Sequence, residues 1–344
     1  MESPSHLGQR PGPLSNPGSS SFTVIIPTHQ RREAVVATLG ALGEQAADCA
    51  VPIALVVIVD GSDDGTAQAV RALQLPMPLH VIEQHRAGVA AARNRGAAAA
   101  TGEWILFLDD DIVVQPGYLA AILDAAREDV DIVLTRLVVG DWVSDSLLSR
   151  EARAWDSDEH AALEHGRTRH DDINFASTAI RRPVFEEAGG FDESFTAGGM
   201  YGNEDVELGH RLLEAGARVR YCPDAMAHTD VIVDADLAMR REYQVGINDV
   251  AMVGKHPDLG EIRFGNRFRY SRIDRVLAPL MLYLPITLAV MAPLRALVRW
   301  LLQRKANGTA AYRIWFTVRA MHYWGGVRVG GGRDMVNEVR HRRG

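Results

Sequence analysis

Cysteine is scarce in this sequence, which has 344 residues and only two cysteines, Cys49 and Cys222. Two thiols are too few for a disulfide framework or a cysteine-bound zinc cluster, so we expect a reducing compartment. Lysine is equally rare, since Lys255 and Lys305 are the only lysines among 37 basic residues. So few lysines beside so many alanines indicate a GC-rich, bacterial coding bias rather than a chemical function.

The amino terminus lacks the apolar core of a signal peptide, because residues 1–21 are rich in Pro, Ser and Gly. We expect this stretch to form a disordered tail. The overall composition, with 47% hydrophobic and 24% charged residues, is typical of a globular protein. It excludes a collagen and a transporter with many membrane spans. The length suggests two domains, or one large domain with an appendage.

Charge is distributed unevenly along the chain, whose formal net charge is −7. From Arg295 to Gly344 there are 11 Arg or Lys residues and two Asp or Glu residues, a balance of +9. The preceding 294 residues carry 26 basic and 42 acidic residues, a balance of −16. An acidic body with a basic carboxyl-terminal segment predicts an anionic partner surface. We expect a membrane rather than a nucleic acid, because no nucleic-acid recognition motif accompanies the charge.

Short apolar runs alternate with helical patterns over the first third of the chain. We expect buried strands at 22–27, 53–59, 79–82 and 104–108, and helices at about 31–46 and 88–100. Continuous apolar strands separated by helices predict a Rossmann-like α/β fold, with a mostly parallel sheet and helices on both faces. Further along we expect a helix from Pro116, strands at 131–139 and 219–222, and a helix near 204–215.

Acidic clusters follow two of the expected strands, at 60–64 and 109–111. In parallel sheets, ligands bind beyond the carboxyl ends of the strands, so both clusters lie where a ligand is expected. The carboxylates of Asp109, Asp110 and Asp111 repel one another unless a cation neutralises them. A hard divalent ion, Mg²⁺ or Mn²⁺, would do so, with Asp109 and Asp111 on one face of the extended chain. A solvated acidic turn is the alternative.

Six segments of the sequence form an ordered set. They are Val24-Ile-Ile-Pro-Thr28, Ile58-Val-Asp-Gly-Ser62, Gly88-Val-Ala-Ala-Ala-Arg-Asn-Arg-Gly96, Ala100-Thr-Gly-Glu-Trp-Ile-Leu-Phe-Leu-Asp-Asp-Asp111, Gly189-Gly-Phe-Asp192 and Gly202-Asn-Glu-Asp205. Their order and spacing, over about residues 22–230, resemble those of glycosyltransferase family 2, which has the GT-A fold. The resemblance implies an inverting transfer of a sugar from a nucleotide-diphosphate sugar to an acceptor hydroxyl.

The resemblance also implies which residues bind the donor. Asp60 matches a position that contacts a uracil-type base in the family, although many members carry a second aspartate just before it. Asp111 is expected nearest the metal and Asp109 towards the ribose. The predicted cofactor-binding residues are Pro27, Thr28, Arg31, Asp60, Arg93, Asn94, Asp109 and Asp110. For Arg93 and Asn94, a packing or capping function is the alternative to a contact with the diphosphate.

Asp205, in the last segment, matches the catalytic base of the family. In a single displacement the acceptor hydroxyl must lose its proton as it attacks the anomeric carbon, and a carboxylate can accept that proton. Glu204 is the reserve candidate, and an N-cap function is the alternative for Asp205. His228 is a candidate third metal ligand beside Asp109 and Asp111, with a purely structural histidine as the alternative.

The 19 residues Val276–Leu294 carry no charge. At ~1.5 Å per residue they reach about 28 Å, but three prolines interrupt the run. A single span would also place the basic segment outside, against the positive-inside tendency. We therefore expect 276–344 to lie on an inner membrane surface, with one true span or a buried oligomer interface as the alternatives.

The expected organisation is a disordered tail at 1–21, a GT-A catalytic domain at 22–235 and a helical region at 236–344. Residues 22–111 would form the nucleotide-binding half and 112–235 the acceptor half. The expected function is metal-dependent transfer of a sugar to a glycan or a lipid-linked acceptor, in polysaccharide or cell-envelope biosynthesis. We expect the enzyme to be cytoplasmic and peripheral on the membrane. A sugar-phosphate nucleotidyltransferase and a non-catalytic glycan- or membrane-binding module are the competing classes.

Overall fold

The computed structural model describes residues 21–342, except 48, 50, 167, 231–233, 285–290 and 305–307. The tail expected at 1–21 therefore lies, apart from Ser21, outside the described residues. The same holds for the middle of the charge-free run.

One eight-stranded sheet forms the centre of the part that the structure describes, with strand order β3-β2-β1-β4-β7-β6-β8-β5. Its strands are β1 (Phe22–Thr28), β2 (Ile53–Asp60), β3 (Leu79–Gln84), β4 (Trp104–Leu108), β5 (Val113–Val114), β6 (Ile132–Val139), β7 (Ser177–Arg181) and β8 (Val219–Thr229). The pairs β2–β3, β1–β2, β1–β4 and β6–β8 are parallel, whereas β7 and β5 pair antiparallel with their neighbours. The expected mostly parallel sheet is confirmed.

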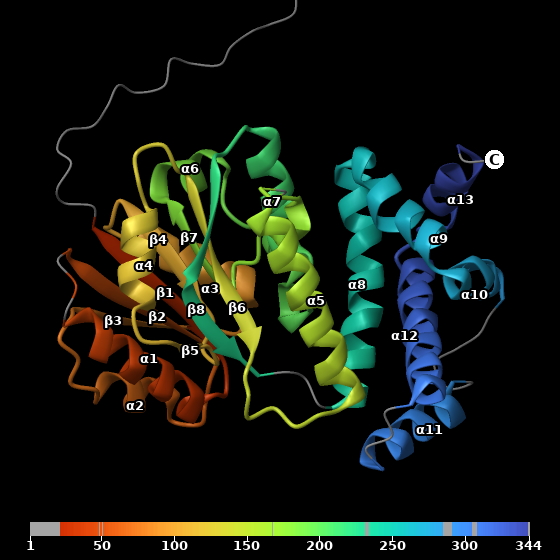
Figure 1. Cartoon of the computed structure of the whole chain (residues 1–344), viewed down its shortest axis with the longest axis horizontal. Coiled ribbons are helices and arrows are strands. Elements are labelled where there is room, and N and C mark those ends of the chain that lie inside the picture. Colours follow the sequence, from red (N-terminus) through yellow and green to blue (C-terminus); the bar gives the residue numbers. More distant parts are fainter. Residues whose placement is uncertain are drawn as a thin grey trace, which may run out of the picture.

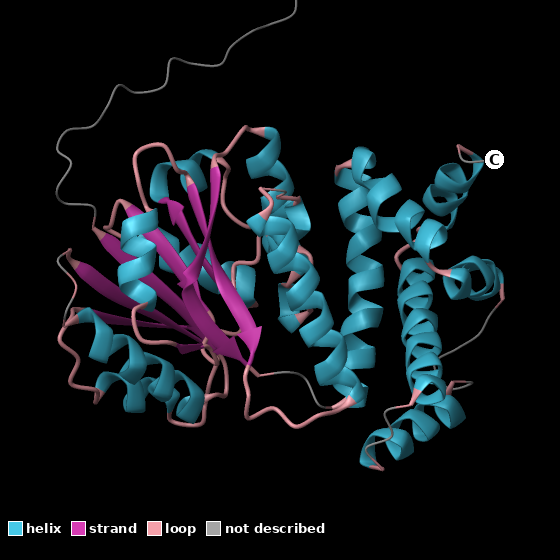
Figure 2. Cartoon of the chain, viewed as in Figure 1, coloured by secondary structure: helices cyan, strands magenta, loops and turns pink. Residues whose placement is uncertain are grey.

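Helices cover both faces of the sheet (Figures 1 and 2). They are α1 (Arg32–Ala46), α2 (Thr66–Arg71), α3 (Val89–Ala99), α4 (Tyr118–Ala125), α5 (Leu147–Glu164), α6 (Arg182–Glu187) and α7 (Glu204–Glu214), with the short helical turns η1 (His170–Asp172), η2 (Glu193–Phe195) and η3 (Ala197–Gly199). One apolar core joins α1, α2 and α4 to one face, and a second joins α3, α6 and α7 to the other. Alternate residues of β1 supply the two cores, since Val24 belongs to the first and Ile25 to the second.

Two differences from the predicted bounds have a clear physical cause. The helix expected at Pro116 begins two residues later, at Tyr118, because Gly117 adopts a left-handed conformation with φ of 85° and is the N-cap of the helix. The strand expected at 219–222 continues to Thr229. A shift in its register against β6 absorbs residues 223–225, after which β8 also pairs with β5. The extension brings His228 opposite Val113, two residues after the acidic triplet.

The carboxyl-terminal region is helical, as expected. Its elements are α8 (Ala235–Lys255), η4 (Pro257–Leu259), η5 (Glu261–Gly265), α9 (Asn266–Tyr270), α10 (Arg272–Tyr283), α11 (Ala292–Gln303), α12 (Thr309–Val329) and α13 (Arg333–His341). Figure 1 shows α5 and α7 between the sheet and α8, with α12 on the far side of α8. The backbones of α8 and α12 meet at glycines, since a Cβ on Gly326 would lie 2.0 Å from the carbonyl oxygen of Tyr243.

None of the helices in the described ranges is both long and apolar enough to cross a membrane. The charge-free run at 276–294 is divided between α10, which ends at Tyr283, and α11, which begins at Ala292. Residues 285–290 between them lie outside the described part.

Candidate active site

The carboxyl ends of β1, β2 and β4 bring the predicted site residues to one edge of the sheet. Thr28 and Asp60 end β1 and β2, and Asp109 follows β4 directly. Pro27 lies within β1 opposite Ile58, so it contributes backbone to this edge. The edge is where parallel sheets bind ligands.

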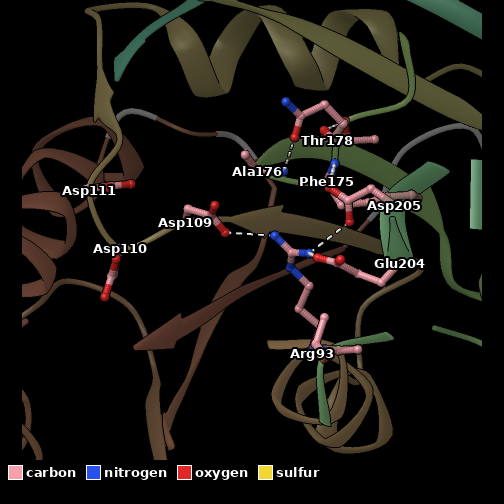
Figure 3. A network of polar contacts seen from close by, with 12 residues as sticks. Arg93, Asp109, Asp110, Asp111, Phe175, Ala176, Thr178, Glu204 and Asp205 are labelled. Atoms are coloured by element: carbon pink, nitrogen blue, oxygen red, sulfur yellow. Dashed lines mark hydrogen bonds and ion pairs between the residues drawn. The ribbon is translucent and has the colours of Figure 1, made fainter. Parts of the chain in front are cut away.

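Arg93 lies at the centre of the site and contacts three carboxylates (Figure 3). Its Nη2 donates to Oδ1 of Asp109 at 2.9 Å. Its Nη1 donates to Oδ1 of Asp205 at 2.9 Å and to Oε1 of Glu204 at 3.2 Å. The arginine thus joins α3, the end of β4 and the first turn of α7, which are up to 112 residues apart in the chain.

The side chain of Arg93 is 3% exposed, and within the described part of the chain its Nε has no hydrogen-bond partner. Burial lowers the pKa of Arg93, but the charges of Asp205, Asp109 and Glu204 raise it more, so the net direction is upward. The cation also lies over the ring of Phe191, 5.4 Å from its centroid. The predicted contact of Arg93 with a diphosphate therefore competes with its observed contacts to three carboxylates.

Glu204 and Asp205 share this buried environment but differ in their partners. Burial, and then the charge of Asp205, raise the pKa of Glu204 to about 7. Burial likewise raises the pKa of Asp205, while Arg93 and the backbone N–H of Phe175, which donates at 3.1 Å, lower it. Asp205 is therefore the better stabilised carboxylate, and Glu204 is the group that more readily holds a proton near neutral pH.

Asp110 points away from Arg93, whereas Asp109 points towards it (Figure 3). Asp110 accepts hydrogen bonds from Thr28 Oγ1 at 2.7 Å and Arg31 Nη1 at 3.1 Å. Burial raises the pKa of Asp110 to about 6, although both of these partners lower it. Arg31 also pairs with Asp111. The structure thus brings together three residues that were predicted to bind the sugar donor: Thr28, Arg31 and Asp110. Their contacts also connect β1 to the end of β4.

Asp60 holds the segment that leads into α3. Its Oδ1 accepts from Gln84 Nε2 and from the backbone N–H of Ala87, each at 2.8 Å, and its Oδ2 accepts from the N–H of Gly88 at 2.9 Å. The side chain is nearly buried. The carboxylate of Asp60 can accept a further hydrogen bond beyond these three, and a nucleotide base would use that remaining acceptor site.

Asn94 makes the packing contacts that were the alternative to a contact with the diphosphate. Its Nδ2 donates to the carbonyl of Phe191 and to Glu193, each at 2.9 Å, and its Oδ1 accepts from the N–H of Phe191 at 2.9 Å. These bonds anchor the segment after α6 to α3. The amide of Asn94 has no unpaired donor to offer a diphosphate without losing one of them.

His228 lies on β8. Its Nδ1 is 3.1 Å from Gln115 Nε2, and its ring meets that of Trp142 edge to face at 5.6 Å. Among the described residues, no three His, Cys, Asp or Glu side chains are grouped closely enough to form a complete metal site. The oxygen-only character of Asp109 and Asp111 nevertheless fits a hard divalent ion, which takes one or two carboxylates and completes its shell with phosphate and water.

Several residues near the site were not predicted. Desolvation of the phenol and then the charges of Glu204, Asp205 and Asp109 raise the pKa of Tyr201, although the residue as a whole is 44% exposed. Asn203 directly precedes the acidic pair and bonds to Asp249 on α8. No function was predicted for Asn203, although a Gly-Asn pair is a turn signal, and Asp249 lies inside a helical pattern that gives no sign of its partner.

A mixed sheet with helices on both faces, and an acidic site at the carboxyl edge of its parallel half, define the GT-A class of nucleotide-sugar-binding folds. The family model "Glycosyl transferase family 2" matches residues 23–189. The chain is thus similar to this family over just under half of its length. The match ends before Glu204 and Asp205, so those two residues enter the site on geometry and on the resemblance of their segment alone.

Curated relatives agree with the family. The pre-mycofactocin glycosyltransferase of Mycobacterium tuberculosis is 28% identical over 72% of this chain and 51% of its own length. The validoxylamine A glucosyltransferase of Streptomyces hygroscopicus subsp. jinggangensis is 28% identical over 71% of this chain and 64% of its own. This chain thus spans between half and two thirds of the length of these relatives.

A solved structure supports the fold. A mannosyltransferase from Pyrobaculum calidifontis, in complex with GDP-Man and Mn²⁺, superposes with a TM-score of 0.58. It is 21% identical in sequence and covers 91% of this chain and 87% of its own. The similarity therefore extends into the carboxyl-terminal helical region, and at this identity it concerns the fold alone.

Proposed function

We propose that this protein transfers a sugar from a nucleotide-diphosphate sugar to an acceptor hydroxyl, with inversion and with Mg²⁺ or Mn²⁺ as cofactor. The observation that carries the proposal is the convergence of Asp109, Glu204 and Asp205 on buried Arg93 at the carboxyl edge of the sheet. This arrangement places a candidate metal ligand and a candidate base on opposite sides of one guanidinium.

The donor would lie along the ends of β1, β2 and β4. Asp60 and Thr28 lie where base and ribose are expected, and Asp109 and Asp111 would hold the metal, with His228 as the third candidate. The cation would neutralise charge that develops on the leaving diphosphate. Arg31 already neutralises part of the charge of Asp110 and Asp111, so the loop can adopt its shape before the donor arrives.

Asp205 would act as general base. The acceptor oxygen forms a bond to the anomeric carbon while the bond from that carbon to the diphosphate oxygen breaks, and the bonding pair leaves with the nucleoside diphosphate. The acceptor proton passes to the carboxylate of Asp205. Arg93 and the N–H of Phe175 keep this carboxylate ionised and oriented. One displacement on one face of the sugar gives inversion.

A lipid-linked or membrane-bound glycan acceptor would fit the carboxyl-terminal region. On α10, the side chains of Val276, Leu280 and Tyr283 are 68%, 38% and 49% exposed and recur at helical spacing. Trp300 on α11 is 50% exposed, and Arg304 lies over its ring at 5.2 Å. Exposed apolar rows beside basic residues are typical of helices that lie in a membrane interface. An interface between copies of this chain is the competing use of the same surface.

A thermal-shift screen tests the proposal. The full-length protein would be scanned with UDP, GDP and their sugars, each with Mn²⁺ and with EDTA. One nucleotide should raise Tm by several degrees, and more with Mn²⁺, because a ligand that binds the folded state stabilises it by mass action. Asp111→Asn should abolish the extra shift with Mn²⁺, while Asp224→Asn, at an exposed carboxylate of β8, should keep it. No shift with any nucleotide would contradict the proposal.

A further inference from the structure

Asn203, which immediately precedes Glu204 and Asp205, has an unusual backbone conformation. Its φ is 76° and its ψ is −4°, in the left-handed region. Of the non-glycine residues in the described ranges, only Gln30 shares a positive φ. Asn tolerates this conformation better than most residues, yet it still carries strain unless the surroundings hold it. Asn203 is the N-cap of α7, but its side chain makes no capping bond.

The side chain of Asn203 bonds instead to the carboxyl-terminal region. Its Nδ2 donates to Oδ1 of Asp249 at 2.6 Å, and its Oδ1 accepts from Nη2 of Arg263 at 3.2 Å. Both polar ends of the amide are thus taken by residues that lie beyond the sheet. Its backbone carbonyl accepts a hydrogen bond from the N–H of Glu207 at 2.9 Å. This bond lies at the start of α7.

Asp249 is itself fixed from three sides. Its side chain is 1% exposed. Besides Asn203, it accepts from Nε of Arg263 at 2.9 Å and from the hydroxyl of Tyr323, on α12, at 2.5 Å. Arg263 continues the network to Asp171 at 2.8 Å. A buried carboxylate with this many donors is rigid, because each lost bond would leave a charge unpaired.

The residue beside Asp249 holds the segment just before Asn203. The amide of Asn248 donates to the carbonyls of Tyr201 at 3.1 Å, Gly202 at 2.7 Å and Phe195 at 3.0 Å. Two adjacent residues of α8, Asn248 and Asp249, therefore hold both ends of the loop at 195–203 through hydrogen bonds. This loop ends where the acidic pair begins.

We propose that Asn203 is a positioning residue for the candidate base, and that Asp249 and Asn248 of α8 supply the support it needs. Asp205 can meet Arg93 and the N–H of Phe175 together only if the first turn of α7 starts at the observed place. The amide of Asn203 fixes that start. The proposal rests on the proposed function, since it assigns to the carboxyl-terminal region a part in the same transfer reaction.

Asn203 could act through its backbone turn or through the hydrogen bonds of its side-chain amide, and Asn203→Gly separates the two. Glycine adopts φ of 76° without strain, so the variant keeps the turn and loses only the amide bonds. Asn203→Ala loses the bonds and adds strain. Asn337→Ala, which removes an asparagine bonded to Tyr283 far from the site, is the matched control.

Two readouts on full-length protein test the proposal. The first needs no substrate: hydrogen exchange of the amides at 195–206 should rise about tenfold or more in Asn203→Gly and stay unchanged in Asn337→Ala. The second is turnover of whichever of UDP-glucose, UDP-N-acetylglucosamine and GDP-mannose is hydrolysed fastest. Its kcat should fall about 10- to 100-fold, while KM for the donor changes less than threefold, because the donor residues lie on other elements.

Wild-type exchange and wild-type kcat in Asn203→Gly would overturn the proposal and limit Asn203 to its turn. A rise in KM for the donor as large as the expected fall in kcat would also overturn the proposal. Failure of the proposed function gives a different pattern: turnover would then survive in Asp205→Asn as well. A kcat that falls in Asp205→Asn but not in Asn203→Gly would contradict the positioning role alone.

Discussion

At the scale of single residues, the site is a balance between one buried cation and several carboxylates. The sequence was sufficient to predict Asp60 and the triplet Asp109–Asp111 at one edge, because the ends of parallel strands meet there. It could not predict that Arg93 contacts Asp205, since nothing local relates two residues 112 positions apart. Arg93 was predicted to contact the diphosphate of the sugar donor. In the structure it pairs with three carboxylates, so it also has a structural function.

Glu204 gives a prediction about stability. Its pKa is raised from 4.5 to about 7. Between these values the native state retains a proton that the unfolded state releases, so ionisation of Glu204 lowers the free energy of unfolding as pH rises through this range. Glu204→Gln removes the ionisable group. In metal-free buffer the variant should match wild type at pH 4.5 and exceed it at pH 8 by up to about 3 kcal/mol.

Urea unfolding at both pH values measures this difference. Glu33→Gln, at a carboxylate 92% exposed on α1, is the control for a general effect of removing one negative charge. A difference between Glu204→Gln and wild type that is the same at both pH values would contradict the raised pKa.

At the scale of elements, the strands and helices of the first 111 residues follow their patterns closely, because buried parallel strands carry a strong apolar signal. The later part was harder to predict. The polar stretch after Cys222 hid the continuation of β8, since three residues leave the register with β6 and the alternation is lost. His228 reaches β5 only through this continuation. Its predicted contact with a metal stays a prediction.

The crossing of α8 and α12 offers a second prediction. A Cβ on Gly326 would lie 2.0 Å from the carbonyl oxygen of Tyr243, whereas one on Gly325 would find its nearest atom at 3.6 Å. Gly326→Ala should therefore force the helices apart and lower stability by about 1–3 kcal/mol. Gly325→Ala should be neutral or gain up to about 1 kcal/mol from helix propensity. Thermal unfolding of both variants checks the contrast, and equal Tm values would show that the helices cross elsewhere.

At the scale of the whole molecule, the charge pattern predicted an acidic body and a basic carboxyl-terminal segment. The boundary at 235 coincides with the start of α8, and its status as a domain boundary stays a prediction. No local pattern indicated that buried bonds from Asn248 and Asp249 cross this boundary, because both residues lie within an otherwise ordinary amphipathic helix. Polar contacts between distant elements depend on the tertiary arrangement, which a local pattern does not encode.

The exposed apolar surface of α10 and α11 leads to the third prediction. Full-length protein should sediment with anionic liposomes, and raised salt should weaken binding, because each basic residue near the surface contributes about 1 kcal/mol. The double variant Val276→Ser, Trp300→Ala should bind about tenfold less, since it removes two of the most exposed apolar side chains. Neutral liposomes are the control. Protein that stays in the supernatant with acidic liposomes would favour an interface between copies of the chain.

The most direct test of the central claim is a comparison of donor binding and turnover in Asp205→Asn. The account predicts nucleotide affinity within about threefold of wild type and a kcat lower by about 10²- to 10⁴-fold, because the substitution removes a general base and leaves the donor residues in place. Asp224→Asn should behave as wild type in both measurements. Turnover in Asp205→Asn equal to that of wild type would contradict the account.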